Sequence, residues 1–239
     1  MATVSIQSPW AIGITFLGAA FSQSALAHVT VTSPKAFSNA YYQVDMAVPH
    51  GCSGADTYRI EVSIPESLTG VRAVLGELGY AELETNPSTG QVNKLIWEKP
   101  DSDLLDSDSH AYNISFRTKL PDVAFTALHF PTVQYCIDSE GVESSSEWIG
   151  TGGHGHHGGS SDELPAPALF IYPPRSSGWN QYIAPDHLHD MSIFKDAEIV
   201  WKGNAAYSPN PHTQSLIEND AEASVLDAIH PGEEFWVKY

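Results

Sequence analysis

Short segments in which apolar and polar residues alternate dominate the chain after residue 27. A two-residue period places successive side chains on opposite faces of a strand, so it predicts β-structure with one buried face. Pro, Gly and Asp separate these segments, and short strands at such spacing are typical of an antiparallel sandwich. We predict an all-β, antiparallel immunoglobulin- or cupredoxin-like β-sandwich over residues 28–175. Its strands are expected at 28–31, 41–48, 57–64, 94–99, 111–120, 127–136 and 168–173.

The alternation also predicts which side chains build the core of this sandwich. The inward positions are apolar and β-branched or aromatic, as a pleated, half-buried surface prefers. The predicted core residues are Val44, Ile60, Ile64, Ile96, Ile114, Phe116 and Val133.

The pattern changes after Arg175, and we treat 176–239 as a small appended C-terminal subdomain. Residues 177–190 are expected to form a loop, 196–211 a strand and turn, 212–229 a short helix, and 233–239 a closing strand. His187 and His189 share a face if the backbone is extended, and with Asp186 or Asp190 they are candidate metal ligands. The alternative is that these polar loop residues are simply solvated.

Residues 1–27 are expected to be a cleaved signal peptide. The apolar run from Trp10 to Phe21 is too short to span a bilayer, and it is followed by the A-x-A signal at Ala25–Ala27. One departure is that residues 1–9 contain no Lys or Arg. The alternative is a buried segment of the domain. No later apolar run is long enough for a membrane anchor, so we expect an exported, periplasmic product.

Composition narrows the classes of function. The chain has 239 residues and a formal net charge of -18, which argues against nucleic acids and anionic membrane surfaces as partners. The nucleophile-elbow, P-loop, dinucleotide-binding and H-E-x-x-H motifs are all missing from the sequence. We therefore expect no catalytic residues.

Cleavage after Ala27 would make His28 the first residue of the mature chain. An N-terminal His offers its α-amine and its ring Nδ1 to one metal ion, and nitrogen ligands of this kind favour Cu(II). Only three Met are present, so a Met-rich Cu(I) site is excluded. The alternative is that His28 follows the cleavage site by chance.

Cys52 and Cys136 are the two cysteines of the chain. In an oxidising compartment such a pair is most simply a disulfide, which closes a long loop and stabilises the fold by about 4 kcal/mol in the chain-entropy model. A thiolate metal site is the alternative, but the cysteines lack C-x-x-C spacing.

Residues 150–163 form a Gly- and His-rich segment that is expected to be a mobile loop. His154, His156 and His157 are weak secondary candidates for metal capture. The alternative is a flexible linker with independent histidines.

Several short segments, in this order and spacing, together resemble a known family between His28 and Ile171. The sequence is similar to the YcnI-like copper-binding domain, also known as a domain of unknown function in many bacteria. The segments are A-H-V-T-V at 27–31, A-Y-Y at 40–42, V-P-H-G-C at 48–52, I-P-E at 64–66, F-P-T-V-Q-Y-C at 130–136, E-W-I at 147–149 and P-A-P-A-L at 165–169.

The resemblance implies an exported β-sandwich that holds one Cu(II) at its mature N-terminus in a monohistidine brace. By match, His28 supplies the amine and the ring nitrogen, Glu66 supplies a carboxylate with Glu61 as the fallback, and Trp148 lies near the copper. The Cys pair resembles the disulfide of the proteobacterial branch. The resemblance covers nothing in 176–239.

The leading hypothesis is a periplasmic copper-binding protein for copper homeostasis or delivery, without turnover. Its partners would be the copper ion and another periplasmic copper-handling protein. One alternative is a copper-dependent oxygenase of the polysaccharide-cleaving type, which needs a second His, for which His50, His110 and His129 are candidates. The other is an envelope protein-interaction module in which metal binding is incidental.

Overall fold

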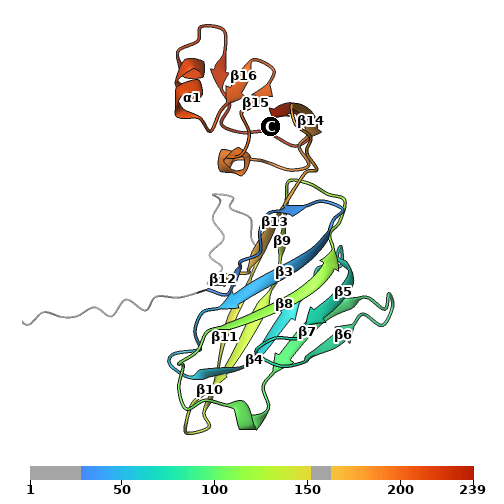
Figure 1. Cartoon of the computed structure of the whole chain (residues 1–239), viewed down its shortest axis with the longest axis vertical. Coiled ribbons are helices and arrows are strands. Elements are labelled where there is room, and N and C mark those ends of the chain that lie inside the picture. Colours follow the sequence, from blue (N-terminus) through green and yellow to red (C-terminus); the bar gives the residue numbers. More distant parts are fainter. Residues whose placement is uncertain (1–27, 152–162) are drawn as a thin grey trace, which may run out of the picture.

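The computed structural model describes residues 28–151 and 163–239. The predicted signal peptide and residues 152–162 of the Gly- and His-rich segment lie outside the described residues. Figure 1 shows an elongated β-sandwich with a smaller unit at one end, joined to it after β13. In the described part of the chain, no helix is long and apolar enough to cross a membrane.

The sandwich is built from short strands arranged in three sheets. Their bounds are β1 (Thr30–Val31), β2 (Ala36–Phe37), β3 (Tyr41–Val48), β4 (Asp56–Ser63), β5 (Thr69–Val74), β6 (Ala81–Thr85), β7 (Val92–Glu98), β8 (Tyr112–Lys119), β9 (Thr126–His129), β10 (Thr132–Ile137), β11 (Glu143–Gly150), β12 (Leu164–Pro165) and β13 (Ala168–Tyr172). A 3-10 helix spans Asp101–Asp103.

Two of these sheets face each other across the main core. The four-stranded sheet has the order β1-β3-β8-β5, and the six-stranded sheet has the order β12-β11-β10-β4-β7-β6. A three-stranded sheet, β2-β13-β9, completes the sandwich. The main core draws on all three sheets, and the T-shaped contact of Phe116 with Phe130 lies within it. The prediction of an all-β sandwich is confirmed.

The predicted strands are found, and the strands that alternation missed lie mostly at sheet edges. The segment predicted at 127–136 is divided into β9 and β10, with Pro131 between them. β5 and β6 form sheet edges, and β11 near a third edge is largely exposed. An edge strand exposed on both faces needs no apolar alternation, so it leaves no such signal in the sequence.

Five of the seven predicted core residues lie in the main core; Ile96 is buried but outside it, and Val133 is only partly buried. Ile96 and Val133 both pair in register with Glu61, so they share its face, which points away from the core. The inward side chains of β7 are Leu95 and Trp97 instead. In that strand three successive residues are buried, so alternation could not identify the core face.

The predicted disulfide between Cys52 and Cys136 is present. Around it, the buried Gln134 side chain donates to the carbonyl oxygen of His50 at 2.7 Å and to Oγ1 of Thr57 at 2.6 Å. The disulfide therefore lies at an end of the sandwich where the buried polar side chains are hydrogen-bonded.

A buried ion pair and a tyrosine join the two large sheets. Asp56, the first residue of β4, is fully buried and pairs with the Lys99 ammonium. The Tyr112 hydroxyl, at the start of β8 in the other sheet, donates to Asp56 at 2.6 Å and accepts from Lys99 at 2.9 Å. Burial first, and then the bond to Asp56, raise the pKa of Tyr112, so its hydroxyl remains a donor.

The C-terminal unit has its own five-stranded sheet of order β14-β18-β15-β16-β17. Its elements are β14 (Trp179–Ile183), β15 (Ile199–Lys202), β16 (Ala205–Tyr207), β17 (Ser224–Val225), β18 (Glu234–Lys238), the helix α1 (Pro211–Glu218) and a 3-10 helix at Met191–Phe194. β14 lies in the segment expected to be a loop, which corrects that prediction. α1 begins where the Asn210 side chain accepts hydrogen bonds from the backbone N–H groups of His212 and Thr213.

The core of the C-terminal unit is completed by a residue of the sandwich. Phe125 precedes β9, is 4% exposed, and lies with its ring 5.3 to 5.9 Å from those of Tyr182, Phe194 and Phe235. Its φ of 58° lies in the left-handed region, which a Phe adopts only where its surroundings hold it. The second core is therefore anchored on the sandwich.

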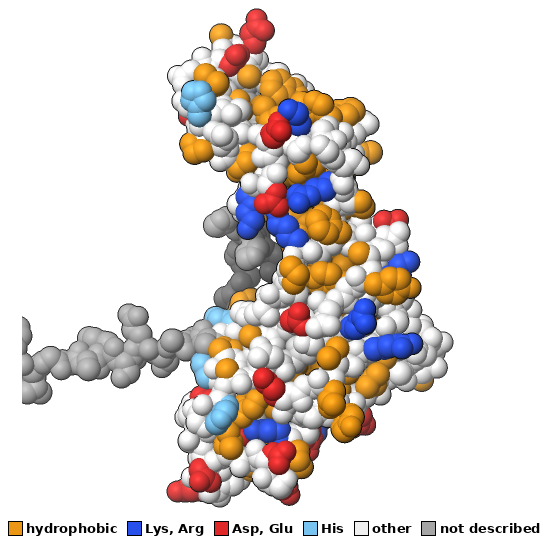
Figure 2. All heavy atoms as spheres, viewed as in Figure 1, with side chains coloured by type: hydrophobic (Ala, Val, Ile, Leu, Met, Phe, Trp, Pro, Cys, Tyr) orange, Lys and Arg blue, Asp and Glu red, His pale blue; other side chains and the backbone are white. Residues whose placement is uncertain are grey.

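Charged side chains also bridge the junction of the two parts. Asp196 of the C-terminal unit pairs with Lys35 of the sandwich and lies 3.4 Å from the Arg175 guanidinium. These two cations, Lys35 first, lower the pKa of Asp196. Figure 2 shows Lys and Arg side chains gathered at this junction. Because the pair is partly exposed, its contribution to stability is modest compared with that of the aromatic contacts.

Replacing Lys99 with Met is expected to destabilise the sandwich by about 3 to 5 kcal/mol, because it leaves the Asp56 carboxylate buried without a counter-charge. Urea denaturation measures this change. Replacing both partners, in Lys99→Met/Asp56→Asn, is expected to recover part of the loss. A Lys99→Met protein as stable as the parent would contradict the structural role of the pair.

Replacing Phe125 with Ala is expected to lower the free energy of unfolding of the C-terminal unit by about 3 to 5 kcal/mol, since it leaves a cavity between three aromatic rings. The unfolding can be followed by the fluorescence of the tryptophans in that unit. Val123→Ala is the matched control, because Val123 lies in the same loop but is 45% exposed. Equal effects of the two substitutions would show that Phe125 does not anchor the unit.

Candidate functional site

His28 lies at the start of an edge strand. It precedes β1, which pairs only with β3 in its sheet through Thr30 with Ala47 and Val31 with Met46. Val29 is 2% exposed and fixes the backbone next to it, while His28 itself is half-buried. The His28 ring makes no hydrogen bond or ion pair with any residue that the structure describes. Both ring nitrogens are therefore available to a ligand.

The start of the chain runs toward the strand that carries Trp148. β2 pairs in parallel with β13 through Ala36 and Ile171, and β1 lies close to β13. Traced from β2 back toward His28, the chain runs alongside β13 in the direction of β12. Leu164 of β12 pairs with Trp148. The topology thus brings His28 and Trp148 to the same side of the sandwich, although no bond joins them.

Trp148 points into the sandwich. It pairs with Thr132 of β10, which in turn pairs with Val62, so all three share the inner face of the six-stranded sheet. The side chain is 4% exposed and belongs to the main core. Its Nε1 is buried and has no hydrogen-bond partner among the described residues. The core residue Trp97 has the same feature, so the unsatisfied Nε1 does not by itself distinguish Trp148 from a packing residue.

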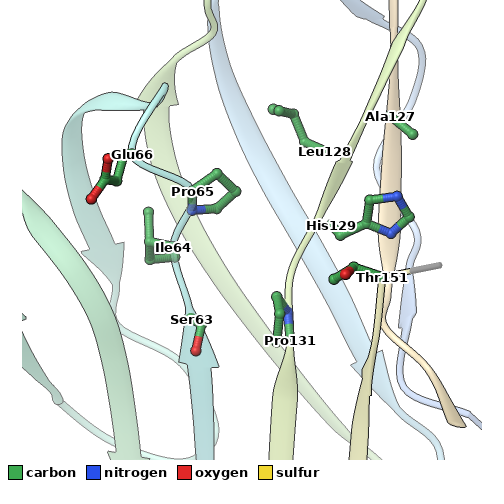
Figure 3. Close-up of a pocket in the computed structure, with 9 residues that line it drawn as sticks. All are labelled: Ser63, Ile64, Pro65, Glu66, Ala127, Leu128, His129, Pro131 and Thr151. Carbon is green, nitrogen blue, oxygen red and sulfur yellow. The ribbon is translucent and has the colours of Figure 1, made fainter. Parts of the chain in front are cut away.

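Glu66 follows the end of β4 and lines a pocket of about 410 Å³. The pocket also contains His129, whose Nδ1 is buried without a partner among the described residues, and Thr151 at the end of β11. Figure 3 shows the Glu66 carboxylate and the His129 ring on opposite sides of Pro65, so they do not converge on one point. Glu66 is exposed and makes no hydrogen bond or ion pair with described residues, whereas His28 is not among the pocket residues.

Glu61, the fallback carboxylate, is held on the outer face of the six-stranded sheet. It accepts hydrogen bonds from Arg59 at 2.5 Å and from Lys94 at 3.0 Å. Burial raises the pKa of Glu61, but the bonds from Lys94 and Arg59 outweigh burial and hold the pKa below its ordinary value. Because Glu61 faces away from Trp148 and is already paired, the expectation that alternation could aim it at the site is not met.

The candidates for a second histidine are distributed over the sandwich. Nδ1 of His50 lies 2.5 Å from the carbonyl oxygen of Gly51 and 4.0 Å from Asp108. His110 bonds with Ser109 at 2.9 Å, and His129 lines the pocket beside Glu66. None of them contacts His28 through a hydrogen bond. Among residues 28–151 and 163–239, no group of three or more His, Cys, Asp or Glu side chains is arranged to hold a metal ion.

The structure also brings together residues that the sequence analysis did not connect. His230 joins His187 and His189 in the C-terminal unit. On the same unit, Trp179, Trp201 and Trp236 lie on three adjacent strands, are 37 to 51% exposed, and line a hollow of about 450 Å³. Trp201 and Trp236 lie at exposed positions of segments predicted as strands, whereas Trp179 lies in the segment expected to be a loop. His154, His156 and His157 lie outside the described residues.

Comparison with solved structures finds likenesses to an uncharacterised protein, a pilin subunit and a putative membrane anchored protein. An uncharacterised Nocardia farcinica protein with an immunoglobulin-like fold is 22% identical, with 61% of this chain and 98% of that chain covered and a TM-score of 0.49. BcpA, the major pilin subunit of Bacillus cereus, is 9% identical, with 66% and 42% covered and a TM-score of 0.33. A putative membrane anchored protein from Corynebacterium diphtheriae is 14% identical, with 61% and 34% covered and a TM-score of 0.34.

None of the curated proteins compared with the chain matches it. A family match, however, begins at His28. It covers residues 28–171, the span of the resemblance to the YcnI-like domain, and ends within β13. The chain therefore belongs to the family described as Domain of unknown function (DUF1775).

Proposed function

We propose that this protein is exported, begins at His28 after cleavage, and binds one Cu(II) ion through that residue for copper homeostasis or delivery. One observation carries the proposal. His28 is the first residue of the family match, and its ring has no partner among the described residues at the open edge of a sheet. A free amine created next to this ring would add a second nitrogen donor at the same place.

The residues present fit the chemistry of a Cu(II) site. The His28 amine and ring supply two nitrogens, and the unpaired carboxylate of Glu66 is suited to complete a mixed nitrogen and oxygen set. The two cysteines are joined to each other, so no thiolate is available among the described residues to favour Cu(I). Bound Cu(II) would supply a redox-active, Lewis-acidic centre.

Trp148 is proposed to border the copper rather than to bind it as a conventional ligand. Its buried ring excludes water from the inner side of the sheet next to β12. The Nε1 donor without a partner among the described residues is free to bond to a group that enters with the ion.

The disulfide supports a location outside the cytoplasm, because structural disulfides persist in oxidising compartments. We place the protein in the periplasm, where it would exchange copper with another copper-handling protein. The net charge of -18 favours the approach of cations over that of anions. Storage or transfer of the ion requires no catalytic residue.

Blocking the N-terminus tests the central step. A protein that retains Ala27, or whose His28 amine is acetylated, is expected to bind Cu(II) about 100-fold or more weakly, because a direct ligand is lost and even outer-shell partners are worth 10- to 100-fold. His28→Ala is expected to act in the same direction. Electron paramagnetic resonance with one equivalent of Cu(II) reports the nitrogen ligands.

Equal Cu(II) affinity in the retained-Ala27 form would overturn the proposal. Reductant-dependent oxygen consumption by the copper-loaded protein, with release of oxidised oligosaccharides, would instead assign it to the polysaccharide-cleaving oxygenases.

Substitutions of Glu66 and Glu61 provide a matched test of the carboxylate ligand. Glu66→Gln is expected to weaken Cu(II) binding by about 10-fold or more, since it removes a charged oxygen donor and leaves the His28 nitrogens in place. Glu61→Gln is the control, because Glu61 lies on the outer face in bonds with Arg59 and Lys94. Competition titration against a chromophoric Cu(II) chelator measures both. A stronger effect at Glu61 would reverse the assignment.

A further inference from the structure

Three histidines are held on one surface of the C-terminal unit by a β-bridge. Leu188 and Ile229 pair in antiparallel fashion through two backbone hydrogen bonds, of 2.8 and 3.0 Å. Their side chains are 5% and 0% exposed and belong to the second core. Alternation then directs the residues next to them to the opposite side, so His187, His189 and His230 are all exposed.

The rings of these residues form a compact group. The ring centroid of His187 lies 5.4 Å from that of His189 and 5.1 Å from that of His230. The centroids of His189 and His230 are 6.3 Å apart. The His187 and His189 rings are stacked, with 4° between their planes. Nδ1 of His187 is 3.0 Å from Nδ1 of His230.

The separation of those two nitrogens suits a shared metal ion. Two imidazole nitrogens bound to one ion at the usual length lie about 2.8 to 3.4 Å apart in square-planar or tetrahedral geometry. The three side chains do not yet surround a single point, in agreement with the lack of a preformed group of three ligands among the described residues. His189 is exposed, so rotation of its side chain can bring a third nitrogen to the pair at little cost.

The neighbouring carboxylates accept hydrogen bonds from backbone N–H groups. They would therefore attract a bound metal ion through their charge and would not ligate it. The Asp186 carboxylate accepts from the N–H of His187, and that of Asp190 accepts from Ser192. Glu233 accepts from the N–H of His230 at 2.7 Å and also pairs with Lys202. These bonds fix the backbone on both sides of the bridge, so the histidines start from set positions.

We propose that His187, His189 and His230 form a surface site for a divalent ion that prefers imidazole ligands, such as Zn(II). The site belongs to the C-terminal unit, which the family match does not include, and it is separate from His28. The protein would then carry two metal ions, one at the chain start and one on the appended unit.

Zn(II) titration calorimetry tests the proposal on the full mature chain. The parent is a His28→Ala variant that also carries His154→Gln, His156→Gln and His157→Gln, which removes the histidines of the chain start and of the Gly- and His-rich segment as competing donors. It is expected to bind one equivalent of Zn(II), and its Tm is expected to rise with Zn(II), because binding to the native state stabilises it.

Adding His187→Gln/His230→Gln is expected to weaken Zn(II) binding at least 10-fold and to abolish the rise in Tm. His212→Gln is the matched control, because His212 is exposed on α1 and has no ring contact with another histidine among the described residues. Zn(II) binding that is unchanged by His187→Gln/His230→Gln, or absent from the parent, overturns the proposal. Since His28 is replaced throughout, failure of the copper proposal does not affect this result.

Discussion

The buried Asp56 carboxylate sets the constraint on which the sandwich depends, because its charge must be balanced where the two large sheets meet. Lys99, the residue after β7, supplies the counter-charge, while Tyr112 of β8 and the Leu105 N–H, at 3.0 Å, donate hydrogen bonds. Asp56 pairs in register with Ile137, and the next residue of β4, Thr57, pairs with Cys136 of the disulfide. Charge and covalent bond together fix where β4 begins relative to β10.

The register of β4 with β10 shifts between Tyr135 and Cys136, and from Arg59 onward the paired residues set the two faces of β4. A slip of one residue would exchange the inner and outer faces of a strand. In the observed register Glu61 faces outward toward Arg59 and Lys94, whereas Val62 faces inward, in line with Thr132 and Trp148. The outward direction of Glu61 therefore depends on the pairing beyond this irregularity.

The sequence predicted the fold from alternation wherever a strand has one buried face, as in β3, which coincides with the expected 41–48. It failed where that condition does not hold. Ile96 lies between two core residues in a strand buried on both faces. In β10 the buried positions hold Thr132, Gln134 and Cys136, so the more apolar Val133 suggested the wrong face. β14 alternates, but its outward residues are Trp179, Gln181 and Ile183, so it resembled a loop.

Site residues depend even more on contacts that the sequence does not contain. His28 was identifiable from the cleavage signal, whereas the roles of Glu66 and Trp148 came only from the resemblance. The apolar and polar pattern of one strand cannot show that Glu61 forms ion pairs with Arg59 and Lys94. Nor can it show that Glu66 forms none with the described residues. His230 was missed for the same reason, because it lies far from His189 along the chain and reaches it only through the Leu188–Ile229 bridge.

The core of the C-terminal unit contains residues from both the sandwich and the β-bridge that carries the three histidines. Leu188 and Ile229 place the three histidines, and they belong to the same apolar group as Phe125, which comes from the sandwich. A residue with a left-handed backbone is retained at such a position only if its packing outweighs the strain. The appended unit is thus seated on the sandwich through a contact that neither part could replace alone.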